Sequence, residues 1–166
     1  MEKNLQNTQA ITKLQNLISD VNTCMLITNG KSGGYNTRPM TVVDTDASGN
    51  LWMFAKRQSH KVKDIEDNGQ VQLVFAHPAR SIYMDIHGRA SIETDKQYIA
   101  DKWNPLVKAW FTDGINDPDV CLIKVRADEA HYWDIEGSKM GIMVKIAVSA
   151  VTGKKLEEGV HGALHF

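Results

Sequence analysis

The chain has 166 residues, of which 42% are hydrophobic, and a formal net charge of −1. This length and composition predict one soluble globular domain, residues 1–166, with a hydrophobic core of its own. The near-neutral charge argues against nucleic-acid binding, and no apolar run approaches the roughly 18 residues that a membrane span needs. The N-terminus lacks the pattern of a secretory signal, so we expect a cytoplasmic protein.

The first half of the chain alternates short apolar runs with turn residues. Glycine-rich NGKSGG and the turn DASGN separate three of these runs, as expected for hairpins. The predicted elements are, in order, an amphipathic helix at 8–21, strands at 24–28, 35–45 and 51–55, a short helix that begins at Ser59, and a strand at 70–77.

The second half contains the longest predicted strand, with a bulge or tight bend expected at Gly88. The predicted elements are a strand at 81–94, two short helices within 95–111 broken at Asn104-Pro105, strands at 120–127 and 130–136, a helix at 139–155, and a short strand at 160–166. Six or seven strands joined mostly by tight turns predict a mainly β fold. We expect a six- to seven-stranded antiparallel, Greek-key-like β-barrel with added helices.

The predicted helix that begins at Ser59 carries its charges in an unusual order. Basic residues stand in its first turn and acidic residues in its last: Lys61 and Lys63, then Asp64, Glu66 and Asp67. A helix dipole favours the opposite order by about 0.3–1 kcal/mol per charge. A cationic helix start with an N-cap serine is, however, a favourable place for a bound phosphate. The alternative is a solvated surface helix in which the pairs Lys61–Asp64 and Lys63–Asp67 offset the dipole cost.

Several motifs occur in an order that resembles a known family. They are TRPM at 37–40, WMFA at 52–55, Ser59-x-Lys61 at a helix start, IHGRA at 86–90, and the later KAWF, DP and YWD elements. This ordered set resembles the pyridoxamine 5′-phosphate oxidase-like flavoproteins, whose fold is the FMN-binding split barrel. The segment DKWNPLVKAWF resembles the general stress protein branch of that family.

The resemblance implies a homodimer that binds FMN in a groove at the subunit interface. The implied contacts are Arg38, Pro39 and Met40 at the ribityl-phosphate side and ring edge, Phe54 and Ala55 along the ring, Ser59 and Lys61 at the phosphate, and Trp103, Trp110 and Phe111 from the second subunit. A guanidinium, an ammonium, a hydroxyl and a helix start together suit a phosphate. Without the resemblance, Arg38 is read as an exposed strand residue, and the three aromatic residues as core or dimer contacts.

The substrate half of the family's site differs here. Val43 holds the place where typical oxidases of the family carry a basic residue for the substrate phosphate, and Tyr83 holds the place of a glutamine. The family's Arg-Leu-His element is also missing after Trp133. We therefore expect an FMN-dependent oxidoreductase of unassigned substrate, reduced by a nicotinamide cofactor or another flavin system, with no catalytic residue assigned. The alternatives are a non-catalytic FMN carrier or stress-related protein and a haem-binding split barrel.

Other chemistry-bearing residues receive structural interpretations. DTDASGN begins like a calcium loop but has Ala55 where the bidentate glutamate is required, so it predicts a hairpin turn. His161 and His165 lack a third ligand nearby in sequence, so no metal site is predicted. Cys24 and Cys121 lie in apolar runs and are expected to be buried free thiols.

Overall fold

The computed structural model describes residues 2–111, 113–134 and 160–166. Its helices are α1 (Asn7–Asp20), α2 (His60–Asp67) and α3 (Lys96–Lys102), with the 3₁₀ turns η1 (Val107–Ala109) and η2 (Gly114–Asn116). Its strands are β1 (Leu5–Gln6), β2 (Thr23–Asn29), β3 (Tyr35–Thr41), β4 (Asp44–Thr45), β5 (Leu51–Lys56), β6 (Gln70–His77), β7 (Ile82–Glu93), β8 (Val120–Asp134) and β9 (Val160–His165). The helix predicted at 139–155 lies outside the described residues.

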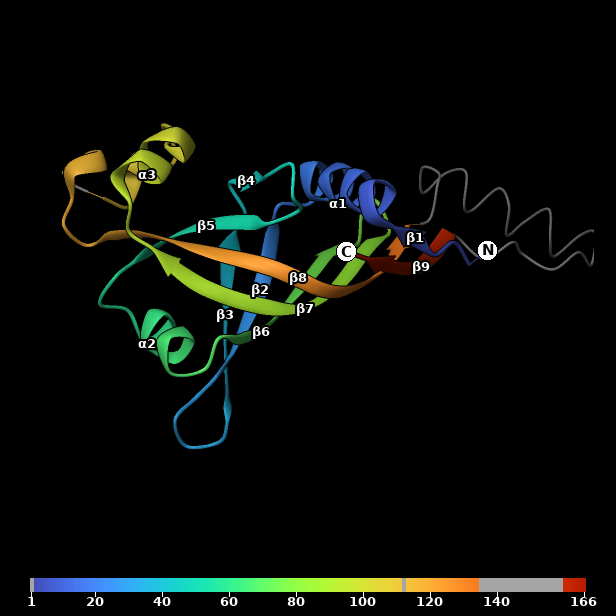
Figure 1. Ribbon diagram of the computed structural model, residues 1–166, viewed down its shortest axis with the longest axis horizontal. Coiled ribbons are helices and arrows are strands. Elements are labelled where there is room, and N and C mark those ends of the chain that lie inside the picture. Colours follow the sequence, from blue (N-terminus) through green and yellow to red (C-terminus); the bar gives the residue numbers. More distant parts are fainter. Residues whose placement is uncertain (1, 112, 135–159) are drawn as a thin grey trace, which may run out of the picture.

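Antiparallel strands form one strongly curved sheet in the order β5-β8-β7-β6-β2-β3. Strand β8 pairs with β7 along one edge, and on its other edge with β5 and then, further along, with β9. Strand β3 ends the order and also contacts β5, which closes the barrel. Figure 1 shows α1 and α2 on opposite sides of the strands, with α3 beyond the end of β5. The structure confirms the predicted mainly β barrel.

The barrel interior is filled by alternate residues of the strands. Val71, Leu73 and Phe75 of β6 and Met84 and Ile86 of β7 are buried, because side chains in a strand point alternately to its two faces. Helix α1 covers one side of the barrel with four buried residues, Ala10, Leu14, Leu17 and Ile18. Both cysteines are buried free thiols, as predicted.

Helix α2 packs against β2 and β7 through a buried face that includes one charged residue. Its apolar contacts are Val62 and Ile65, and Asp64 is buried beside them. A buried carboxylate requires partners, so this residue connects the fold to the site described below.

Two predicted boundaries are wrong. The strands predicted at 120–127 and 130–136 are one continuous strand, β8. The polar Asp128, which reads in sequence as a turn residue, is the extra residue of a β-bulge, since His87 pairs with Glu129 and Gly88 with Ala127. The strand predicted at 35–45 is divided into β3 and β4.

The helices of the described residues include none that is long and apolar enough to cross a bilayer.

We predict that Gly88→Ala will lower the free energy of unfolding by about 2–4 kcal/mol. A Cβ atom at Gly88 would collide with the main-chain oxygen of Arg126 across the bulge. Gly34→Ala is the matched control, because a Cβ there has open space, and its stability should change little. Urea unfolding of the three proteins checks this, and equal midpoints for both variants would contradict the role of the bulge.

Candidate functional site

Arg38 lies in the middle of β3 on the face that points into the barrel, opposite the buried Leu26 of β2. Its side chain is only 20% exposed. One terminal nitrogen of the guanidinium donates to Thr28 Oγ1 at 2.6 Å, and the other donates to Asp64 Oδ2 at 3.4 Å. Arg38 is therefore held between the sheet and helix α2, and is not the exposed strand residue that the motif alone suggests.

Asp64 is the acceptor on which this arrangement converges. In addition to Arg38, its Oδ2 atom accepts from Thr28 Oγ1 at 2.7 Å and from Asn36 Nδ2 at 2.9 Å. Burial alone would raise the pKa of Asp64, but the hydrogen bonds from Asn36 and Thr28 and the charge of Arg38 outweigh it and hold the pKa below 3.8. We call Thr28, Asn36, Arg38 and Asp64 the Arg38–Asp64 network. It joins β2, β3 and α2.

The start of α2 carries an unpaired hydroxyl. Ser59 is the N-cap residue of the helix, as predicted, but its side chain makes no capping hydrogen bond. Its Oγ atom is buried, and it has no hydrogen-bond partner among the residues that the structure describes. The first N–H groups of a helix also lack carbonyl partners within the helix. Hydrogen-bonding capacity is therefore left over at this end of α2.

Positive charge gathers at the same end. Lys61, in the first turn of α2, is half-buried. Burial lowers the pKa of Lys61, and the positive charges of Arg38 and Lys56 lower it further, against a small opposing effect of Cys121. Arg38 approaches the same helix from β3, because it donates to Asp64, three residues after Lys61. Two cations, an unpaired hydroxyl and a helix start suit an oxyanion such as a phosphate.

Three aromatic residues form a group on the face of β5 that is turned toward α3. Phe54, near the end of β5, packs edge-on against Trp103, with ring centroids 5.5 Å apart, and its centroid is 6.3 Å from that of Phe111. Phe111 is buried, whereas Phe54 and Trp103 are half-buried. The ring centroids of Trp103 and Phe111 are 6.1 Å apart, and all three of these contacts are within one chain. The expected approach of Trp103 and Phe111 to a flavin of the second subunit stays a prediction.

The other predicted site residues lie on β5, on β3 and in the segment after α3. Ala55 is buried in β5, and its main-chain oxygen accepts from Cys121 Sγ at 3.4 Å. Pro39 is exposed on the outer face of β3, and Met40 packs against the core. Strand β3, which carries Pro39 and Met40, contacts β5. Trp110 is 75% exposed and is not part of the aromatic group.

Of the Arg38–Asp64 network, sequence reasoning singled out only Arg38 as a site residue. Its alternative interpretation of α2, a solvated surface helix, paired Asp64 with Lys61 and Asp67 with Lys63. Asp64 instead pairs with Arg38, and Asp67 pairs with Lys31 at 3.0 Å. One signal was available, because Asn36 lies two residues before Arg38 and therefore shares its face of the strand.

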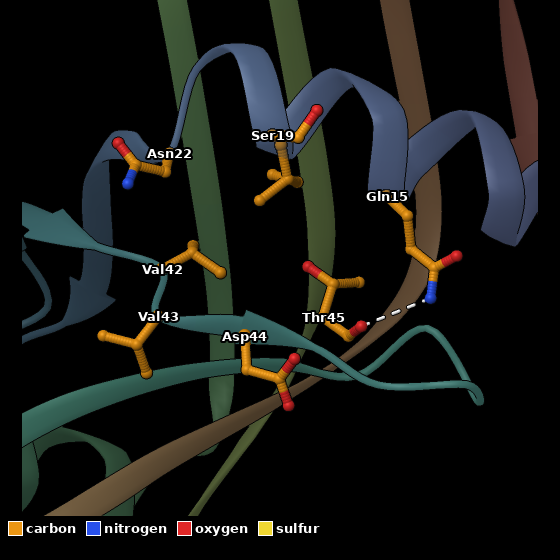
Figure 2. A pocket seen from close by; sticks show the side chains of 8 residues that line it. Gln15, Ser19, Asn22, Val42, Val43, Asp44 and Thr45 are labelled. Atoms are coloured by element: carbon orange, nitrogen blue, oxygen red, sulfur yellow. Dashed lines mark hydrogen bonds between the residues drawn. The ribbon is translucent and has the colours of Figure 1, made fainter. Parts of the chain in front are cut away.

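A separate hollow of about 300 Å³ lies between α1 and residues 42–45. Figure 2 shows Gln15 reaching from α1 to Thr45, whose main-chain oxygen accepts from its amide at 3.2 Å. The buried hydroxyl of Thr45 also lacks a partner among the described residues. The one charged residue of the lining, Asp44, accepts from Lys102 Nζ at 2.5 Å. The hollow therefore lacks the positive charge that distinguishes the start of α2.

A second hollow of about 490 Å³ is lined largely by polar residues of β2, β3, β6 and β7, and Thr28 of the Arg38–Asp64 network is among them. Ser59 and Lys61 line neither hollow. In the described part of the chain, His, Cys, Asp and Glu side chains form no group of three that could hold a metal ion. The group of Ser59 and Lys61 at the start of α2 is therefore separate from both hollows, and it is not part of a metal site in the described part of the chain.

The model of the pyridoxamine 5′-phosphate oxidase-like family matches residues 9–157. The chain belongs to this family. The protein bli-3 of Neurospora crassa is 28% identical over 156 residues, which cover 88% of this chain and 75% of that protein.

Solved structures agree with this assignment. The general stress FMN/FAD binding protein of Xanthomonas citri is 29% identical with a TM-score of 0.66, over 78% of this chain and 90% of that chain. General stress protein 26 of Bacillus anthracis is 28% identical with a TM-score of 0.65, over 74% and 92% of the two chains. A structure from Jannaschia sp. CCS1, described as a general stress protein 26, covers 96% of this chain and 100% of its own at a TM-score of 0.80. At 24% identity, it shows the shared fold alone.

We predict that Asp64→Asn will lower the free energy of unfolding by about 2–4 kcal/mol at neutral pH, because Arg38 loses its buried counter-charge. Asp67→Asn on the same helix is the control, since its pair with Lys31 is exposed and should contribute less than about 1 kcal/mol. Urea unfolding measures both.

The same pair of variants predicts a pH dependence. The folded-state pKa of Asp64 is lowered, so its contribution is complete above the ordinary value of 3.8 and is lost as the pH falls through the lower folded value. The stability difference between wild type and Asp64→Asn should therefore shrink in acid below pH 3.8. A difference that stays constant down to the acid unfolding limit would contradict the assignment.

Proposed function

We propose that this protein binds FMN, with the phosphate at the start of α2. The observation that carries the proposal is the buried Ser59 hydroxyl, which has no partner among the described residues and stands two residues before Lys61 on the helix that Arg38 contacts. A phosphate monoester carries up to two negative charges and several strong acceptor oxygens, so it would accept from this hydroxyl and from both cations. The match to the family, and a relative described as an FMN/FAD binding protein, support a flavin as the source of the phosphate.

The isoalloxazine ring would lie against the half-buried side of the aromatic group. Phe54 offers an apolar wall at the end of β5, and the main chain of Pro39 and Met40 comes from the neighbouring edge of β3. Flat apolar walls with a few fixed polar groups suit a flavin ring. FMN, when bound, supplies the capacity to accept and pass on electrons, while the protein binds the cofactor, orients it and limits access of water.

The proposed activity is that of an FMN-dependent oxidoreductase of unassigned substrate, with a nicotinamide cofactor as electron donor. One observation favours a second candidate, an FMN-binding protein without such turnover. Val43, at the position of the substrate-binding base of typical family oxidases, packs in the apolar cluster that contains Phe54 and Trp103. An apolar side chain at this position provides no positive charge to bind the phosphate of a substrate.

We also propose that two chains form a homodimer with the flavin at their interface. The outer face of the sheet exposes several large apolar side chains, namely Met25, Tyr35, Tyr83 and Trp133, and the segment after α3 exposes Leu106 and Trp110. Exposed apolar residues of this size are typical of interaction surfaces when they are contiguous. Pairing with a second copy would remove them from water.

The visible spectrum of the purified protein tests the proposed function. We expect a yellow protein with flavin absorbance that bleaches anaerobically on addition of NADPH or NADH, and light scattering of the same sample should give the mass of a dimer. Flavin binding without bleaching would favour the non-catalytic candidate. A colourless protein that does not take up added FMN would overturn the proposal.

Reversal of one charge tests the phosphate assignment. We predict that Lys61→Glu will weaken FMN binding by about tenfold to hundredfold, because a carboxylate replaces a cation next to the phosphate. Lys63→Glu is the matched control, since Lys63 is exposed on the same turn of α2 and should change affinity far less. Quenching of flavin fluorescence measures the FMN affinity of both variants. Equal affinities would contradict the assignment of the phosphate to the start of α2.

A further inference from the structure

We propose that Thr28, together with Asp64, is a positioning residue that orients Arg38 toward the phosphate and thereby sets the preference for FMN over riboflavin. This inference rests on the proposed function, because it assigns a role at the same site. It goes beyond that function by assigning the preference to two residues that the phosphate need not touch.

Thr28 has a single hydroxyl that serves two partners. It donates its proton to Asp64 Oδ2 at 2.7 Å, so the same oxygen is available to accept from Arg38 at 2.6 Å. The side chain of Thr28 is buried, with 1% of the residue exposed. Its direction of donation is fixed because a carboxylate can only accept. The hydroxyl therefore acts as a directed link between the carboxylate and the guanidinium.

The link leaves part of Arg38 free. A guanidinium has five N–H donors, and Thr28 and Asp64 take one from each terminal nitrogen. The remaining three have no hydrogen-bond partner among the described residues, although the side chain is only 20% exposed. The contact with Asp64 attaches the guanidinium to α2, the helix whose first turn carries Lys61. A fixed group of free donors beside this helix is a preorganised anion site.

Binding of a phosphate requires an ordered arginine side chain, and the network orders Arg38 before the ligand binds. A free arginine side chain loses several rotamers when it binds a phosphate, and this loss weakens affinity. Since β2 and α2 already hold Arg38, less freedom is lost on binding. Riboflavin has the same ring and ribityl chain but no phosphate, so the orientation of Arg38 should affect FMN far more than riboflavin.

A merely structural role predicts a different result. Thr28 and Asp64 also attach α2 to the barrel, so their loss lowers stability under either interpretation. A loss of stability changes the folded fraction equally for both ligands and leaves the ratio of their dissociation constants unchanged. The ratio of the two dissociation constants therefore distinguishes a positioning role from a purely structural role.

The experiment compares FMN and riboflavin dissociation constants, measured by fluorescence quenching, in wild type and in Thr28→Val. This substitution keeps the shape and removes the hydroxyl without changing any charge. We expect the preference for FMN to fall about threefold to tenfold, because Arg38 loses its contact with Thr28 but keeps its contact with Asp64. Thr28→Ser, which keeps the hydroxyl, should restore the preference. Thr23→Val is the matched control, an exposed threonine on the same strand.

A second variant keeps the test decisive if Thr28→Val does not fold. Asn36 is exposed, and its amide donates to the same oxygen of Asp64, so Asn36→Ala loosens the carboxylate at little cost to the core. Its preference for FMN should fall by about twofold. An unchanged preference in the folded variants would overturn the positioning role while leaving the proposed function intact. A wild-type protein that does not distinguish FMN from riboflavin would instead overturn the phosphate assignment itself.

Discussion

The buried contact between Asp64 and Arg38 is the constraint on which the site depends. A carboxylate inside a protein must be paired and hydrogen-bonded, because removing a charge from water is costly. Asp64 meets this requirement with three donors from β2 and β3, which fixes both the seat of α2 against the barrel and the direction of Arg38. The same interaction therefore fixes both the position of α2 and the orientation of the Arg38 side chain.

The start of α2, by contrast, has a buried polar group whose hydrogen-bonding capacity is not satisfied within the described residues. Lys61 stands in the first turn of α2, Arg38 contacts the same helix through Asp64, and Ser59 has a buried hydroxyl without a partner among the described residues. Like charges that approach each other and a buried unpaired hydroxyl both oppose stability. An anion at this end of the helix would offset both, and the order of charges in α2 would then be favourable. The chain belongs to the pyridoxamine 5′-phosphate oxidase-like family, and one relative is described as an FMN/FAD binding protein.

The barrel positions these groups by bringing together strands that are distant in the chain. Strand β8 is long enough to pair with β5 at its start and with β9 at its end, and β3 closes against β5. The end of β5, the edge of β3 and the start of α2 therefore meet in one region. Val43 and the aromatic group pack together in an apolar cluster between β5 and α3.

The sequence by itself determined the class of fold and most of its elements. Alternation of apolar residues located β2, β5, β6 and β7, and merged β3 with β4. The ordered motifs around Arg38, Ser59 and Lys61 identified the family. Both signals are local in the chain. Only the tertiary structure decided that Asp64 is buried against Arg38, and that Asp128 is a bulge within one strand rather than a turn between two. A polar residue in a strand or on a short helix looks the same in sequence whether it faces water or a partner. Its environment is fixed by the elements that pack on it from elsewhere in the chain.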